Sequence, residues 1–367
     1  MVLNLRNEMF TEKMFLLLKH GKIEIFSFRY ESGVAALKIK NGSSEFVMLP
    51  FQGQQIWDFY YKGQKISMET TITRPEKTKE YLMNYGGFLY HCGITAFGCP
   101  QKDDEHPQHG ELPNAEYRKA YIKIGQDDKG RFIVLGGEYE YDKAFIRKYM
   151  FIPECKVYED QGIFHYDIRL INRKKTPMEY MYLCHINFKP LHGARILYSA
   201  KKDSAHIKIH KEGMEKLPEK IREPLLKYVG ELNKNISIAD SVLEDGQIYN
   251  PEICFTVFYV GDENGKAYTM QREVGKGACF VSHYVEELPY VIRWISATPD
   301  EKAMGMALPA TSEHLGYSYA KRNGQVKILP PIGEARFRID CGYIEEERAK
   351  EIEERIDDIL RADSLKS

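Results

Sequence analysis

The sequence predicts an all-β fold, a large antiparallel β-sandwich with a short helical insertion and a C-terminal helix. Short runs of alternating apolar and polar residues follow one another, and Gly or Asn-Gly turns separate them. The chain is rich in Tyr and Phe, which favour strands. Its 367 residues can bury a substantial core, and no repeat or linker divides them. We therefore expect a single domain over residues 1–367, with the sandwich core at about 24–342.

The first half of the chain contains most of the predicted strands. Four strands come first, at residues 24–30, 33–40, 45–49 and 54–61. Residues 70–118 then interrupt the pattern with a long stretch rich in Gly, Pro, His and Asn. A loop of this length is usually functional or disordered, and its aromatic and His content favours a functional loop. Six strands follow, at residues 120–124, 131–134, 137–141, 145–151, 163–172 and 178–185.

The second half adds two predicted helices to further strands. Met214, Ile221, Leu225 and Val229 share a helical face, which predicts a helical insertion at about 212–232. The next strands are expected at residues 252–260, 278–281, 290–298 and 335–342. The chain ends in a predicted amphipathic helix at about 344–362, whose narrow apolar stripe packs either on the sheet or on a partner subunit. The possibility that the protein is a homodimer therefore stays open.

Charge and composition exclude several classes of protein. Lys plus Arg number 52 and Asp plus Glu 53, so the formal net charge is −1 and no basic excess indicates nucleic-acid binding. No stretch approaches the roughly 20 apolar residues of a membrane span, so no membrane partner is expected. The sequence starts without a secretory leader, and its seven scattered cysteines suit reduced thiols. We expect a cytoplasmic protein.

Polar residues that could carry chemistry gather first in the long irregular stretch. The segment His106-Pro-Gln-His109-Gly-Glu111 offers two imidazoles and a carboxylate. These groups can bind sugar hydroxyls, move protons or ligate a metal, and a solvated polar loop is the alternative. Their spacing differs from the common zinc motifs, so we expect no metal and no cofactor.

Two further clusters lie at strand ends. His185 and Asn187 alternate along the end of the strand at 178–185, so both side chains point to one face. Glu334 follows a Pro-Pro-x-Gly turn and begins the strand at 335–342. A core histidine and an exposed carboxylate paired with Arg336 or Arg338 are the structural alternatives. No nucleotide-binding glycine loop and no serine-hydrolase elbow is present.

Taken in order, these clusters resemble the galactose mutarotase-like superfamily, which includes the aldose 1-epimerases. The resemblance rests on His109-Gly110 in a loop, His185 in a strand-end motif, and Glu334 after a Pro-Gly type turn. The segment Leu49-Pro-Phe-Gln-Gly-Gln-Gln-Ile-Trp57 is similar to an early hairpin of that family. The fold implied is the galactose mutarotase-like supersandwich. The activity implied is the interconversion of α and β anomers of a free sugar.

The resemblance also implies roles for individual residues. Glu334 would be the base, His185 the acid, and His109 a group that binds the sugar and stabilises its ring oxygen. Asn187 would contact the substrate. The usual substrate-gripping arginine is not evident; the candidates are Arg74, Gln52, Gln54 and Asn84. Trp57 and Trp294 would stack on the sugar, with burial in the core as the alternative for each.

Three other functions stay open at this point. A carbohydrate-binding protein would keep the pocket without turnover. A metal-dependent isomerase or oxygenase of the cupin type would use His106, His109 and Glu111. A polysaccharide lyase is disfavoured, because a groove for an acidic polymer should be basic. In each case the expected ligand is a sugar.

Overall fold

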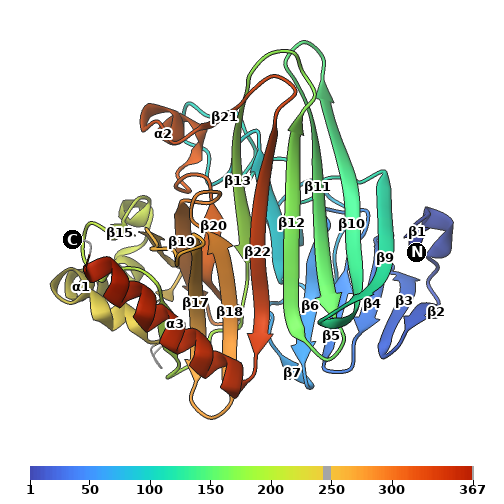
Figure 1. Ribbon diagram of the computed structural model, residues 1–367. Helices are drawn as coiled ribbons and strands as arrows, with labels where there is room; N and C mark the ends of the chain where they lie inside the picture. Colours follow the sequence, from blue (N-terminus) through green and yellow to red (C-terminus); the bar gives the residue numbers. More distant parts are fainter. Residues whose placement is uncertain (243–248, 366–367) are drawn as a thin grey trace.

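Two large antiparallel sheets face each other in the computed structural model, which describes residues 1–242 and 249–365 (Figure 1). One sheet has nine strands in the order β1-β9-β10-β11-β12-β22-β18-β17-β14. The other has thirteen, in the order β15-β16-β19-β20-β13-β8-β6-β5-β4-β3-β2, with β21 paired to β13 and β7 to β6. The predicted all-β sandwich is confirmed.

Apart from β1, the nine-stranded sheet takes its strands from the middle and end of the chain. Its strands are β1 (Val2–Asn4), β9 (Lys119–Asp127), β10 (Gly130–Lys143), β11 (Arg147–Tyr158), β12 (Gly162–Asn172), β14 (Arg195–Tyr198), β17 (Lys266–Glu273), β18 (Gly277–Tyr284) and β22 (Glu334–Ile344).

The thirteen-stranded sheet takes strands from both halves of the chain. They are β2 (Phe15–His20), β3 (Ile23–Arg29), β4 (Ala35–Lys40), β5 (Ser44–Met48), β6 (Ile56–Tyr61), β7 (Gln64–Lys65), β8 (Leu89–Ile94), β13 (Met178–Ile186), β15 (Ile207–His210), β16 (Ile253–Val257), β19 (Tyr290–Ala297), β20 (Lys302–Ala310) and β21 (Lys327–Leu329). The sheets thus begin before residue 24, because β1 and β2 join their edges.

Aromatic side chains join the two sheets across the core. Phe164 of β12 contacts Phe46 and Phe59 of the other sheet, with ring centroids 4.9 Å apart in both pairs. Tyr182 of β13 stacks on Phe337 of β22 at 4.6 Å. One hydrophobic cluster therefore spans both sheets. The single domain over residues 1–367 stays a prediction.

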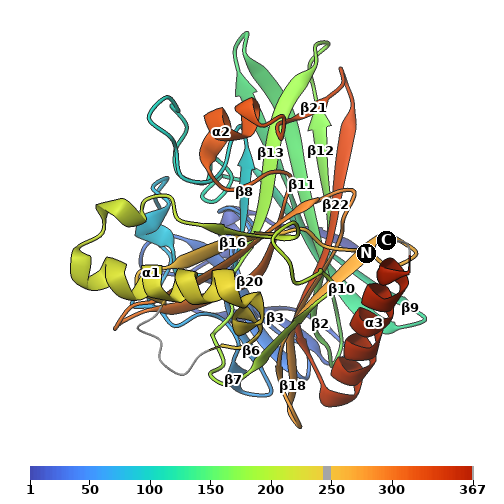
Figure 2. The same cartoon turned by 90° about the vertical axis from the view of Figure 1, so that its left-hand side faces the viewer.

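Both predicted helices are present, and a third short one, α2 (Gly316–Arg322), was not expected. The insertion contains α1 (Glu219–Lys234), two residues longer at its end than predicted, which lies far from α3 in Figure 2. The C-terminal helix α3 (Glu346–Ser364) buries Ile352, Ile356 and Ile359 in a cluster that includes Met270 and Phe280 of β17 and β18. The stripe therefore packs on its own sheet. Among the described helices, none combines the length and apolarity that crossing a membrane requires.

Candidate functional site

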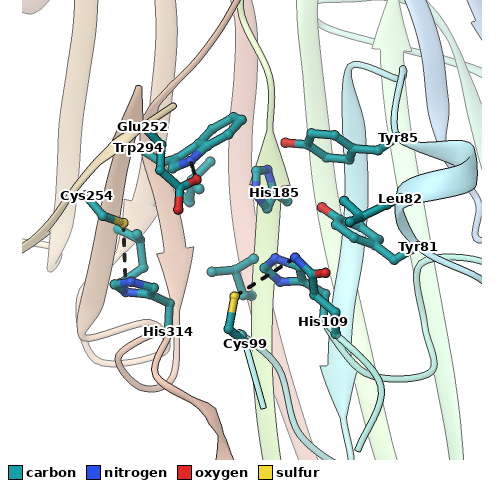
Figure 3. Close-up of a pocket in the computed structure, with 15 residues that line it drawn as sticks. Tyr81, Leu82, Tyr85, Cys99, His109, His185, Glu252, Cys254, Trp294 and His314 are labelled. Atoms are coloured by element: carbon teal, nitrogen blue, oxygen red, sulfur yellow. Dashed lines mark hydrogen bonds between the residues drawn. The ribbon is translucent and has the colours of Figure 1, made fainter. Parts of the chain in front are cut away.

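A pocket with a volume of 140 Å³ lies on the thirteen-stranded sheet (Figure 3). Its floor comes from neighbouring strands, with Leu183 and His185 on β13, Leu308 on β20 and Trp294 on β19. Successive side chains of a strand point to opposite faces. Because Tyr182 enters the core between the sheets, Leu183 and His185 point away from it. The pocket therefore opens on the outer face of this sheet.

The irregular stretch at 70–118 forms one wall of this pocket. Tyr81, Leu82 and Tyr85 line it from the segment before β8, and Cys99 and His109 line it from the loop after β8. The opposite wall consists of Glu252, Cys254 and His314. Leu82 and Cys99 are exposed, so the pocket opens to solvent beside them. The prediction of a functional loop here has a structural basis, since the loop closes the site.

His185 is the most completely fixed polar group in the pocket. Its Nδ1 lies 2.8 Å from Oδ1 of Asn187. The Asn187 amide donates through Nδ2 to the carbonyl of Gly87 at 3.0 Å, and its Oδ1 also accepts the Tyr85 hydroxyl at 3.0 Å. Oδ1 can only accept, so Nδ1 of His185 carries the proton and Nε2 keeps a lone pair. Burial lowers the pKa of His185 to about 4, so the ring is neutral at pH 7.

His109 and Tyr81 present polar atoms without protein partners. The His109 ring lies 4.7 Å from the Tyr81 ring and 5.3 Å from the His185 ring, between centroids. Among the described residues, neither His109 Nδ1 nor the Tyr81 hydroxyl has a hydrogen-bond partner. Burial, followed by the neighbouring His185, lowers the pKa of His109 well below its usual range. A buried polar atom without a partner is costly, and a ligand in the pocket would supply one.

Among the described residues that line this pocket, Glu252 is the only one with a carboxylate. The Trp294 indole N–H donates to Oε2 of Glu252 at 2.6 Å, which orients the carboxylate at the pocket rim. The Trp294 ring lies 5.4 Å from His185 and 6.1 Å from Tyr85, between centroids. Figure 3 shows Glu252 on the wall across from Tyr81 and His109. The pocket therefore combines one carboxylate, neutral imidazoles and aromatic rings.

His314 lines the lower part of the pocket and packs against another imidazole, that of His210. Nδ1 of His314 lies 3.9 Å from Sγ of Cys254, and the His314 ring packs edge-on against His210 at 4.6 Å. Burial, then the neighbouring His210, lowers the pKa of His314 to about 3. Burial raises the pKa of the Cys254 thiol, so the thiol stays protonated at pH 7. The His314 ring and the Cys254 thiol are therefore both neutral at pH 7.

The structure contradicts the prediction that Glu334 faces His185. Glu334 begins β22 in the nine-stranded sheet, whereas His185 lies in the other sheet. Phe337 points into the core, so Glu334 shares the outer face with Arg336. Its side chain is 45% exposed and lies 3.9 Å from Arg169. Glu334 is thus an exposed carboxylate, as in the structural alternative, although its partner is neither Arg336 nor Arg338.

Three predicted sugar contacts also lie away from this pocket. Trp57 is 1% exposed and packs in a separate apolar cluster with Val47 and Leu49, so the core alternative holds. The Gln52 side chain donates to the carbonyl of Glu76 and borders a different surface pocket. Arg74 is exposed, with its guanidinium 2.9 Å from the Glu31 carboxylate.

The alternatives Gln54 and Asn84 have structural partners instead of a ligand. The Gln54 amide donates to the carbonyl of Pro50. The Asn84 amide donates to Oδ1 of Asn114 at 2.7 Å and accepts the backbone N–H of Glu76. Both side chains are buried. Asn84 thereby joins two parts of the stretch that forms the pocket wall, whereas Gln54 stabilises the connection between β5 and β6.

The candidate metal set of the long loop does not assemble. Glu111 is partly buried and accepts hydrogen bonds from Thr95 and from the Tyr149 hydroxyl of the other sheet. Nε2 of His106 instead lies 3.4 Å from the Asp104 carboxylate. Within residues 1–242 and 249–365, no group of three or more His, Cys, Asp or Glu side chains could hold a metal ion.

The structure thus brings together His109, His185, Asn187 and Trp294 from the predicted set. Asn187 lies behind His185, where it is fully buried. Sequence reasoning did not single out several lining residues, among them Tyr81, Tyr85, Glu252 and His314. The only signal for Glu252 is that it starts the predicted strand at 252–260 and is the only carboxylate in that strand. No motif marks any of these four residues.

Known structures with the same fold extend this description. A Klebsiella pneumoniae protein, described provisionally as an aldose 1-epimerase, has a TM-score of 0.77 at 16% identity, over 94% of this chain and 89% of that one. A galactose mutarotase-like protein from Clostridium acetobutylicum has a TM-score of 0.57 at 13% identity, over 89% and 100%. One from Lactobacillus casei has a TM-score of 0.50 at 9% identity, over 84% and 100%. The galactose mutarotase-like fold is confirmed.

Sequence comparison gives a family and no characterised relative. No curated protein matches the chain. Residues 31–342 match a family described as a domain of unknown function, DUF4432. The match covers most of the sandwich, including every strand that contributes to the pocket floor. The chain therefore belongs to the DUF4432 family, with a galactose mutarotase-like fold.

Proposed function

We propose that the chain is an aldose 1-epimerase-like isomerase, which binds a free sugar in this pocket and interconverts its α and β anomers. The observation that carries the proposal is that one aromatic-walled pocket holds both the Glu252 carboxylate and a His185 ring whose Nε2 can accept a hydrogen bond. Trp294 and Tyr85 offer ring faces to the apolar side of a sugar. The fold supports a sugar as the ligand class, because structures named galactose mutarotase-like share it.

In this proposal Glu252 takes the role that the sequence suggested for Glu334. Ring opening removes a proton from the anomeric hydroxyl and adds one to the ring oxygen, and both oxygens are bonded to the same carbon. Glu252 accepts the hydroxyl proton while the bond between the anomeric carbon and the ring oxygen breaks, and then returns that proton to the ring oxygen. Rotation of the aldehyde and the reverse steps give the other anomer. The Trp294 N–H holds one carboxylate oxygen and leaves the other for the sugar.

His109 and Tyr81 would stabilise the charge that forms during this step. Negative charge develops on the ring oxygen as its bond to carbon breaks. The Tyr81 hydroxyl has no acceptor among the described residues, and a neutral His109 carries one N–H. Donors already held in a water-poor pocket stabilise such charge without further reorganisation.

His185 acts as an acceptor in this scheme, which differs from the acid role that the resemblance implied. Its Nδ1 proton is committed to Asn187, so Nε2 has no proton to give in the neutral ring. A pKa of about 4 keeps this form dominant at neutral pH. Nε2 therefore accepts a hydrogen bond from a sugar hydroxyl and orients the anomeric centre toward Glu252.

Exchange NMR between the α and β signals of free sugars tests the proposal. We expect wild-type protein to accelerate exchange of at least one aldose in a panel of hexoses, pentoses and their phosphates, in proportion to protein concentration. Saturation transfer from protein to sugar, measured on the same samples, separates binding from turnover. Binding without faster exchange would favour a carbohydrate-binding protein. If no sugar in the panel shows either faster exchange or saturation transfer, the proposal is refuted.

A further inference from the structure

Four large apolar side chains gather at one end of the sandwich, and none of them lines the pocket described above. Phe145 is 100% exposed, and Ile146, Ile328 and Ile332 are 62%, 66% and 61% exposed. We call these four residues the apolar tip. They lie at the end of the β10–β11 hairpin and beside the turns that lead into β21 and β22, at the top of Figure 1. Contiguous exposed apolar groups usually mark an interaction surface.

Hydrogen bonds hold the parts of the apolar tip together. Nζ of Lys174 donates to the carbonyls of Phe145 and Ile146, at 3.0 Å each. The backbone N–H of Ile332 donates to the carbonyl of Lys174 at 3.0 Å. Ile146, Lys174 and Ile328 also line one surface hollow. The apolar tip is therefore a built feature and not a set of separate loop ends.

Backbone conformation adds to the cost of this surface. Phe145 has a φ of 66° and Ile332 a φ of 56°. This left-handed region suits Gly or Asn in a turn, and an aromatic or β-branched residue there is unusual. If these side chains had no function, Gly at both positions would make the folded protein more stable. The conformation holds the Phe145 ring outward at the extreme end of the hairpin.

Cations without acidic partners surround the apolar tip. Lys143 and Arg147 lie directly opposite each other at the end of the hairpin, an arrangement that is unfavourable without a nearby anion. Arg173 and Lys175 are exposed on the next turn. In the part of the chain that the structure describes, no ion pair includes Lys143, Arg173 or Lys175.

The acidic residues near the tip already have partners. Asp142 pairs with Lys148 at 2.6 Å, and Glu179 pairs with Lys321. The surface that remains is basic around an apolar projection. Two copies facing each other through this surface would bring their cations together, so self-association is disfavoured here. A flat protein partner would also meet little area on a narrow hairpin end.

We propose that the apolar tip docks this protein on an anionic lipid surface. Phe145 and Ile146 enter the interface between headgroups and acyl chains, and Lys143, Arg173 and Lys175 contact the anionic headgroups. This docking is peripheral, so it is compatible with the absence of a spanning helix among the described residues. This docking differs from the expectation that the protein has no membrane partner, because that expectation considered only membrane-spanning segments.

Sedimentation with sucrose-loaded vesicles tests the docking. The full chain should sediment with vesicles of phosphatidylcholine and phosphatidylglycerol, bind phosphatidylcholine alone weakly, and lose binding as salt rises. Phe145→Ser should lower partitioning about tenfold, because it removes one buried aromatic side chain. Lys175→Glu should lower it by about fivefold or more. Val274→Ser is the matched control, since Val274 is 74% exposed in the β17–β18 turn.

Several outcomes would overturn the docking. One is equal binding by wild type, Phe145→Ser and Val274→Ser; another is no sedimentation with anionic vesicles. A third is self-association in lipid-free solution that Phe145→Ser abolishes, measured by analytical ultracentrifugation, because the tip would then be a protein interface. Thermal unfolding confirms that each variant is folded. The sugar-exchange rate in solution should be the same for all of them, so this test and that of the proposed function fail independently.

Discussion

Replacement of Asn187 by Leu tests how the protein sets the protonation of His185. Asn187 is fully buried, and Leu has a similar size. The change removes three hydrogen bonds, to the His185 ring, to the Tyr85 hydroxyl and to the carbonyl of Gly87. The His185 ring would then lose the acceptor that keeps its proton on Nδ1.

The expected magnitudes follow from those three bonds. Each buried polar group left without a partner costs about 1–3 kcal/mol, so the free energy of unfolding should fall by about 3 kcal/mol or more. A neutral hydrogen bond contributes about 1 kcal/mol, so its loss lets the Nε2–H tautomer of His185 compete with the Nδ1–H tautomer. That tautomer offers no acceptor to the sugar. We expect anomer exchange to slow by about five- to tenfold, since 1.4 kcal/mol corresponds to a factor of about 10.

Asn172→Leu is the matched control for this change. Asn172 is also fully buried, and its amide donates to the carbonyls of Thr176 and Pro330 at 2.8 and 2.9 Å. It should lose comparable stability in urea unfolding while exchange and the His185 tautomer stay unchanged. Nitrogen-15 shifts of the ring report the tautomer directly. The reasoning fails if Asn187→Leu keeps His185 in the Nδ1–H form, or if both variants lose exchange equally.

Three further changes probe burial and the pocket. Burial lowers the pKa of His91 and that of His283 to about 3. As the pH falls from about 6.5 toward 3, these two histidines therefore bind protons in the unfolded chain but not in the folded chain. Urea unfolding at pH 7 and pH 5 should show a loss of about 2 kcal/mol for each of them, and equal stability at both pH values would contradict this. Tyr81→Phe should slow exchange about tenfold while changing stability by less than about 1 kcal/mol, because among the described residues the hydroxyl it removes has no hydrogen-bond partner. Trp57→Ala should cost about 3–5 kcal/mol without slowing exchange by folded protein, and slower exchange would restore Trp57 to the sugar site.

Local patterns predicted the strands and part of the site. The alternation at the end of β13 placed His185 and Asn187 on one face, and both lie there in the structure. Helical periodicity predicted both ends of α3 and the C-terminal end of α1 to within about two residues, whereas α1 begins at Glu219, later than the predicted 212. These features depend on neighbours in the sequence, so the sequence alone could reveal them.

The remaining features depend on contacts between distant segments. Glu334 carried a plausible turn motif, but the sheet that β22 joins and the face that Glu334 takes are set by pairing with β12 and β18. Glu252 had no motif, and it reaches the pocket only because β16 lies beside β19. Tyr81 and His109 come from a loop whose path is fixed by buried side chains such as Asn84 and Glu111. The cytoplasmic location and a homodimer stay predictions.

The most direct test of the account compares Glu252→Gln with Glu334→Gln. Each change keeps the size of the side chain and removes its ability to accept a proton at neutral pH. The measurement is exchange NMR of the sugar that the wild-type protein turns over fastest, with saturation transfer to confirm binding. We predict that Glu252→Gln slows exchange by about 10²-fold or more while the sugar still binds, and that Glu334→Gln leaves exchange unchanged. Full exchange by Glu252→Gln, or its loss in Glu334→Gln, would contradict the assignment of Glu252 as the base.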